Sequence, residues 1–205
     1  MTLYLKATSS RSAPRLFQVR GLCSTLGEDE AGLLTVSSAN DPLFSIYCAD
    51  NRFILVPHAR DILLNGEVLE TDVAAPLEDG TRFSLHDREF QSLITSALSE
   101  ALARTTVTLA EISRPDLKLE SLPLVSFSLA GTGKSYPLFP DVRYVAGNSP
   151  RSAIHLPLEG IAPCHCDFQY SGGSVSIRSL EGKITLRGRE PDTACQVTED
   201  CAVTL

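Results

Sequence analysis

Several features that would place this chain in a familiar class are missing. It has no run of about 18 or more apolar residues, the length that a membrane-spanning helix needs, and no charged-then-apolar leader of the kind found in signal peptides. Its 18 Lys and Arg against 25 Asp and Glu give a net charge of −7, so it lacks the basic excess that binds a nucleic-acid backbone. We therefore expect an intracellular protein, nuclear or cytoplasmic, with no membrane span and no nucleic-acid partner.

Cysteine is too scarce to form the framework of the fold. The chain has six cysteines in 205 residues and is 43% hydrophobic, so a disulfide scaffold is not needed. Reduced, mostly buried thiols are expected, because a free cysteine behaves as a small hydrophobe. Cys164-His165-Cys166 has zinc-compatible ligand types, but the spacing does not fit a zinc finger, and alternate strand residues point to opposite faces. We predict no metal and no cofactor, and metal analysis of the purified protein distinguishes this from the zinc alternative.

No catalytic set is readable either. The histidines are scattered, and no G-x-S-x-G nucleophile motif accompanies them: His58 and His86 are expected in loops, His155 in a strand. Residues 131–135 (Gly-Thr-Gly-Lys-Ser) look like the end of a P-loop, but the Tyr136-Pro137 that follows cannot start the helix that such a loop needs. We interpret this segment as a turn between strands, with ATP binding as the alternative, and we predict that the chain is not an enzyme.

What the sequence does contain is a second copy of itself. Residues 2–85 and 126–205 align at a nearly constant offset of about 120 positions, with Gly27 matching Gly147 and Ser45 matching His165. Two copies of this length are too few and too long for a solenoid, and they favour two small domains. The first copy is the acidic one: residues 1–90 hold 8 Lys and Arg against 13 Asp and Glu, which gives −5, whereas residues 118–205 hold 8 against 9, which gives −1.

Both copies have the pattern of antiparallel β-structure. Short segments of alternating apolar and polar residues predict strands, for example residues 3–6, 16–20, 44–48, 53–56 and 82–85. Turn residues that tolerate positive φ lie between them, as in Asn65-Gly66 and Asp79-Gly80. The sequence therefore predicts a β-sandwich or barrel in each copy.

One segment departs from this pattern. From Asp87 to Arg104 the apolar residues recur with the 3.6-residue period of an amphipathic helix, namely Phe90, Leu93, Ile94, Ala97, Leu98, Ala101 and Leu102. We expect this helix to connect the copies within residues 87–117 and to bury its apolar stripe against one of them.

The order of these short motifs resembles that of forkhead-associated (FHA) domains. The second copy shows Gly147, the Ile154-His155-Leu156 run, His165, Arg187-Gly188 and a closing hairpin at 197–205; the first shows Gly27, Asn65-Gly66 and the closing residues 77–80. The resemblance implies an all-β chain of two FHA-like antiparallel β-sandwiches joined by an amphipathic helix. The expected domains are residues 1–86, a helical connector at 87–117, and residues 118–205.

The resemblance also implies a phosphothreonine site, from which both copies depart. The family's phosphate-binding Arg after the first glycine is replaced by Glu28 and Asn148, and its phosphate-binding Ser by Pro42 and Ala162. The family's structural His becomes Ser45 in the first copy and is retained as His165, and the peptide-gripping Asn falls at Arg60 and Gly182. Acidic residues 28–30 would also repel a phosphate in the first copy.

Two functions follow from the resemblance. The first is a non-enzymatic scaffold that binds protein partners independently of phosphate, within a larger assembly such as a kinetochore or chromosome-segregation complex or a secretion machine. The alternative is a phosphothreonine-peptide reader that uses only the second copy, where Arg151, His165, Lys183 and Arg187 form a substitute site.

Overall fold

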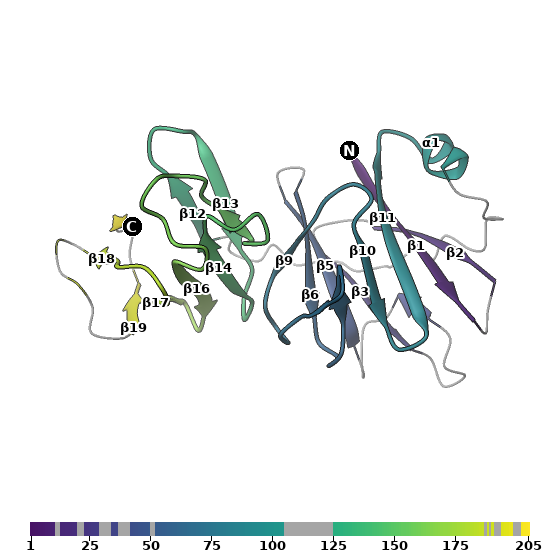
Figure 1. Cartoon of the computed structure of the whole chain (residues 1–205), viewed down its shortest axis with the longest axis horizontal. Coiled ribbons are helices and arrows are strands. Elements are labelled where there is room, and N and C mark those ends of the chain that lie inside the picture. The colour runs from purple at the N-terminus through teal and green to yellow at the C-terminus, as the bar shows by residue number, and fades with distance from the viewer. Residues whose placement is uncertain are drawn as a thin grey trace. The chain divides into compact units, whose positions relative to one another are not determined.

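The computed structural model describes residues 1–10, 13–19, 23–28, 34–36, 42–49, 52–104, 125–186, 188, 190, 194–198 and 202–205. The chain divides into two compact units, one of Met1–Thr71 with Pro76–Ser121 and one of Asp72–Ala75 with Leu122–Leu205. Among the described residues, no helix is long and apolar enough to cross a membrane. The predicted all-β class is confirmed, because nearly every regular element is a strand and nearly every strand pairing is antiparallel (Figure 1).

The first unit contains two sheets. The six-stranded sheet has the order β2 (Arg15–Gln18), β1 (Thr2–Ser9), β11 (Arg88–Thr95), β10 (Arg82–Leu85), β7 (Leu63–Leu64) and β8 (Glu67–Val68). The five-stranded sheet has the order β4 (Leu34–Val36), β3 (Cys23–Glu28), β5 (Pro42–Ala49), β6 (Arg52–Pro57) and β9 (Ala75–Leu77). Asn65 and Gly66 both have positive φ, 51° and 88°, as predicted for the tight turn that joins β7 to β8.

Aromatic rings from both sheets form the centre of the first unit's core. Phe44 of β5 packs edge-on against Phe83 of β10 and Phe90 of β11, with ring centroids 5.2 and 5.1 Å apart, and Phe83 stacks on Phe90 at 4.7 Å. Phe83 and Phe90 alternate with polar neighbours along their strands, so the period-2 pattern places them in the core, whereas Phe44 follows Leu43, which is also buried. The two sheets therefore form a sandwich around one shared core.

The helix predicted from Asp87 to Arg104 is wrong over most of its length. Residues Arg88–Thr95 form β11, and only Leu98–Ala103 is helical (α1). Strand β11 pairs with β1 over eight residues and with β10 over four, so ladder hydrogen bonds outweigh the local helical pattern. The predicted connector 87–117 thus begins inside a sheet, and its residues 105–117 lie outside the described residues.

The apolar pattern of residues 88–95 resembles that of a helix because strand β11 is covered on both faces. Phe90 of β11 points into the sandwich core, whereas Leu93 lies in a second apolar cluster with Tyr4, Leu16 and Ala101 of α1. Apolar residues on both faces break the period of two, and their spacing then coincides with a helical stripe. Of the predicted apolar stripe, Ala101 is buried in this cluster.

The second unit has a five-stranded sheet with the order β15 (Ile154–His155), β14 (Arg143–Gly147), β16 (Cys166–Ser171), β17 (Ser174–Ser179) and β19 (Ala194–Val197). Two strand pairs accompany it, β12 (Val125–Leu129) with β13 (Lys134–Leu138) and β18 (Thr185–Leu186) with β20 (Val203–Thr204). Taken along the sequence, this sheet repeats the strand order of β4-β3-β5-β6-β9 in the first unit. The pairing differs at one edge, because β3 and β4 are antiparallel whereas β14 and β15 are parallel. The duplication read from the sequence stays a prediction.

Candidate functional site

The centre of the candidate site is the buried imidazole of His165 in the second unit. His165 is 3% exposed and immediately precedes β16. Its Nδ1 accepts a hydrogen bond from the Ala162 N–H at 3.1 Å, and its Nε2 lies 2.9 Å from the Lys183 carbonyl oxygen. Because an N–H only donates and a carbonyl only accepts, these partners assign the neutral tautomer with the proton on Nε2. His165 thus joins two loops and offers no surface to a ligand.

Three loops meet around this ring, and the central one is the segment before His165. The loop after β14 makes two hydrogen bonds to this segment. The Asn148 N–H donates to the Ala162 carbonyl at 2.9 Å, and the Ser152 hydroxyl donates to the Pro163 carbonyl at 3.2 Å. The loop after β17 donates to it from Glu181 N–H to the Cys164 carbonyl at 3.1 Å. Residues 148–153, 160–165 and 180–184 therefore form one loop cluster.

Two glycines allow these loops to approach so closely. A Cβ at Gly147 would lie 2.0 Å from the Pro163 carbonyl oxygen, and one at Gly182 would lie 2.0 Å from the His165 Nδ1. Neither position has room for a side chain, since real Cβ atoms do not approach other atoms so closely. Both residues were noted in the sequence only as family positions, and packing gives the physical reason for each.

The other predicted site residues have different surroundings. Arg151 is exposed, in the loop after β14, and Lys183 is exposed, in the loop after β17. The structure brings both loops onto the same segment, 162–165, but the Lys183 ammonium lies 3.6 Å from the Glu190 carboxylate. Arg187 lies outside the described residues. The substitute phosphate site built on these cations stays a prediction.

Sequence reasoning missed two side chains that hold the loop cluster together. Ser152 is buried and hydrogen-bonded to Pro163, and the Glu181 carboxylate accepts the Cys164 N–H at 3.1 Å. No local pattern in the sequence shows which distant N–H the Glu181 carboxylate will accept. The three-loop arrangement therefore needed the tertiary structure.

The matching position in the first unit is built from a different set of side chains. Ser45 of β5 takes the place of His165, is 3% exposed, and has its hydroxyl 2.9 Å from the Thr25 hydroxyl and 2.8 Å from the His58 Nε2. A hydroxyl beside an imidazole is also the arrangement of a nucleophile and its base. Here the hydroxyl is buried and already bonded to Thr25, so it links β3, β5 and the residue after β6 instead of facing a substrate.

The acidic segment of the first unit is only partly described. The Glu28 carboxylate forms an ion pair with the Arg88 guanidinium, which reduces its repulsion of an anion. Residues 29 and 30 lie outside the described residues. The predicted repulsion of phosphate at this end of the unit therefore rests on these two residues and stays a prediction.

The remaining motifs have structural explanations. Residues 131–133 form the exposed turn between β12 and β13, as predicted, and the Thr132 hydroxyl accepts the Lys134 N–H at 3.1 Å. His58 and His86 lie in loops and His155 in β15, also as predicted. Among the described residues, no three His, Cys, Asp or Glu side chains are arranged to hold a metal ion.

The thiols and one phenol of the core have raised pKa values. Burial, together with the charge of Asp167, raises the pKa of Cys166 to about 12, and burial raises the pKa of Tyr144 above its usual range. Burial also raises the pKa of Cys23 and of Cys48. The five described cysteines are free thiols. Only Cys166 is buried and the other four are half-buried, so the expectation of mostly buried thiols is wrong for the described cysteines.

An ion-pair cluster lies on the same sheet as Cys166. The Asp167 side chain is 7% exposed, and its carboxylate lies 2.5 Å from the Arg178 Nη2 and 3.7 Å from the Arg143 Nε. The three residues come from β16, β17 and β14, so the cluster spans three adjacent strands. It links these strands through side chains in addition to their backbone ladders.

Comparisons with known proteins find likenesses at the level of structure. No known protein family's sequence profile matches the chain, and none of the curated protein sequences matches it. The FHA domain of the CT664 protein from Chlamydia trachomatis is 21% identical over 40% of this chain and 83% of that one, with a TM-score of 0.35. An FHA domain studied for phosphothreonine-dependent interactions is 18% identical over 37% and 78%, with a TM-score of 0.34.

A third similar structure is the FhaA FHA domain complexed with the intracellular domain of Rv3910. It is 17% identical over 37% of this chain and 82% of that domain, with a TM-score of 0.34.

Proposed function

We propose that this chain is a non-enzymatic scaffold of two FHA-like β-sandwiches that binds protein partners independently of phosphate, within a larger assembly. The observation that carries the proposal is the composition of the loop cluster around His165. Backbone hydrogen bonds and the side chains of Ser152 and Glu181 hold the three loops in a fixed arrangement. The residues at the three family positions of this cluster are Asn148, Ala162 and Gly182.

These side chains are poorly suited to a phosphate. A phosphothreonine carries a charge of about −2 and needs charge-assisted hydrogen bonds, which guanidinium groups, hydroxyls and free N–H groups supply. Ala162 has a methyl group and Gly182 has no side chain, and the N–H groups of Asn148, Ala162 and Gly182 are already bonded within the unit. Such a site favours recognition through shape and polar contacts over recognition through a phosphate.

The alternative is a phosphothreonine reader that uses the second unit alone. It is favoured by the exposure of Arg151 and Lys183 on two loops that share one supporting segment. Against it, Lys183 is close to Glu190, so one of the two cations already has an acidic neighbour.

Affinity capture tests the scaffold proposal. The full chain is immobilised and incubated with native lysate, one half of which has been treated with a broad phosphatase, and bound proteins are identified by mass spectrometry. The scaffold retains the same partners from both halves. Partners that are retained only from the untreated half support the reader instead, and the Arg151→Ala chain then loses them.

A further inference from the structure

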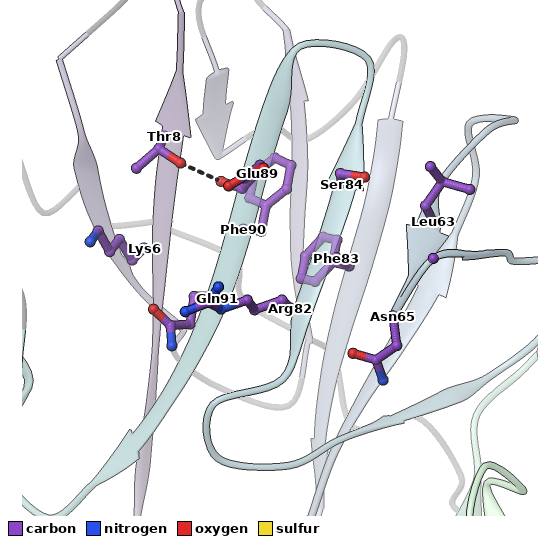
Figure 2. A pocket seen from close by; sticks show the side chains of 11 residues that line it. Lys6, Thr8, Leu63, Asn65, Arg82, Phe83, Ser84, Glu89, Phe90 and Gln91 are labelled. Carbon is purple, nitrogen blue, oxygen red and sulfur yellow. Dashed lines mark hydrogen bonds between the residues drawn. The ribbon is translucent and has the colours of Figure 1, made fainter.

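The outer face of the six-stranded sheet in the first unit carries a groove of about 340 Å³. Successive strand residues point to opposite faces, so the core positions Phe83 and Phe90 leave their neighbours on the outside. The groove crosses β1, β11 and β10 and reaches the turn after β7 (Figure 2). Its lining includes seven polar residues: Lys6, Thr8, Asn65, Arg82, Ser84, Glu89 and Gln91.

The groove contains two rows of side chains that run across the strands, and in the first row Lys6 and Arg82 flank the amide of Gln91. Lys6 pairs with Gln91, and Gln91 pairs with Arg82, so the three residues lie in one row across three adjacent strands, as Figure 2 shows. Neighbouring strands lie about 5 Å apart, which puts the Lys6 and Arg82 backbones about 10 Å apart. Both side chains are long enough to converge on one anion above Gln91, whose amide adds a further donor.

In the part of the chain that the structure describes, the Lys6 ammonium and the Arg82 guanidinium have no ion-pair or hydrogen-bond partner. Arg88 and Arg104 of the same unit, by contrast, pair with Glu28 and Asp79. Two adjacent free cations are unexpected on a segment, residues 1–90, whose net charge is −5.

The second row limits what can bind. Thr8 pairs with Glu89, Glu89 with Ser84 and Ser84 with Leu63, so one free carboxylate lies next to the cationic row and an apolar residue lies at its end. Leu63 in turn pairs with Val68, which is 65% exposed. An occupant therefore needs negative charge on the first row, none over Glu89, and an apolar side chain near the Leu63–Val68 end.

A peptide meets these requirements better than a small ion does. Strands β1 and β10 both pair with β11 beneath the groove, so side chains supply its donors, and they are spread along the groove. We propose that this groove binds an extended acidic segment of a protein partner, with a carboxylate between Lys6 and Arg82 and an apolar side chain against Leu63 and Val68. The groove belongs to the first unit and the loop cluster to the second, so this proposal stands whether or not the loop cluster binds phosphate.

Fluorescence anisotropy of the full chain tests the groove. The probe is a labelled peptide in which Glu and Leu alternate with Gly and Ser, and its analogues carry Gln or Lys in place of Glu. Ion pairs at exposed sites are modest, so Lys6→Ala and Arg82→Ala should each weaken binding about two- to fivefold, and the double variant about five- to twentyfold. Glu89→Gln removes a like charge and should strengthen binding about twofold.

Controls separate the groove from general charge. Lys134→Ala removes an exposed lysine of the second unit and leaves the affinity unchanged, and higher salt weakens binding of the Glu peptide. NMR spectra of the full chain should show the largest shifts at the side-chain amides of Gln91 and Asn65, and this readout does not depend on any variant. Undetectable binding of the Glu peptide, equal binding of the Gln or Lys peptide, unchanged binding by the double variant, or shifts confined to the second unit would each overturn the proposal.

Discussion

The imidazole of His165 lies directly against the backbone of Gly182, so close that a Cβ at residue 182 would be 2.0 Å from the ring Nδ1. The ring is held on its other sides by Ala162 and Lys183, so it cannot easily move away. Close packing of a glycine against a buried ring thus fixes the distance between β16 and the loop after β17.

Gly182→Ala should therefore destabilise the second unit by about 1 to 3 kcal/mol, the usual cost of overpacking. Urea unfolding followed by circular dichroism measures the loss, and hydrogen exchange at the Ala162 amide reports it locally. A double-mutant cycle provides the control. In a His165→Ala background the added methyl meets no ring, so the effect of Gly182→Ala should shrink or vanish; an undiminished effect contradicts the contact.

The Asp167 ion pairs should matter more than the exposed pair of Lys183. Because Asp167 is buried and bonded to Arg178, Asp167→Asn should lower the free energy of unfolding by about 1 to 3 kcal/mol. Lys183→Ala removes an exposed pair and should cost less than about 0.5 kcal/mol. Urea titrations of the two variants in parallel give the comparison, and equal effects would argue against the buried cluster.

Stability should fall at alkaline pH because of Cys166. Its pKa is raised from 9.0 to about 12 in the folded state, so the folded and unfolded thiols are equally protonated below pH 9. Between pH 9 and pH 12 only the unfolded thiol ionises, which favours unfolding by up to about 1.4 kcal/mol per pH unit. The raised pKa of Tyr144 acts in the same direction above its ordinary value of 10.0.

The measurement is the urea midpoint at pH 8, 9 and 10, with Cys166→Ala as the control. The variant should show a shallower loss between pH 9 and pH 10, since one ionising group is gone. In the folded protein Cys166 should also resist alkylation by iodoacetamide at pH 8, because its thiol is both buried and protonated. Identical pH profiles for the two chains would rule out this role of Cys166.

The strands could be predicted because their signal is local. Alternation placed Phe44 and Phe83 in the core, and Asn65-Gly66 marked a tight turn that the structure contains. Strand β11 could not be predicted, because Phe90 and Leu93 are buried on opposite faces, and the cover on the second face comes from α1 and from residues near the N-terminus. The part of that cover that comes from Tyr4 and Leu16 cannot be read from residues 87–104 alone.

The candidate site could likewise be predicted only in part from the sequence. His165 was predicted to be structural, as the resemblance implied, and its buried ring with two backbone partners is consistent with that role. The supporting Ser152 and Glu181 could not be predicted, because each bonds to a backbone group on another loop. The hydrogen bond between Ser45 and His58 was missed for the same reason, since 13 residues and a hairpin separate them.

The most direct test of phosphate-independent recognition is a titration of the full chain with phosphothreonine peptide libraries and their unphosphorylated counterparts. If recognition is independent of phosphate, the phosphorylated and unphosphorylated peptides of each pair bind with equal affinity or show no binding, and Arg151→Ala does not change this affinity. Micromolar binding that requires the phosphate and is lost in Arg151→Ala would contradict phosphate-independent recognition and assign the second unit as a phosphopeptide reader.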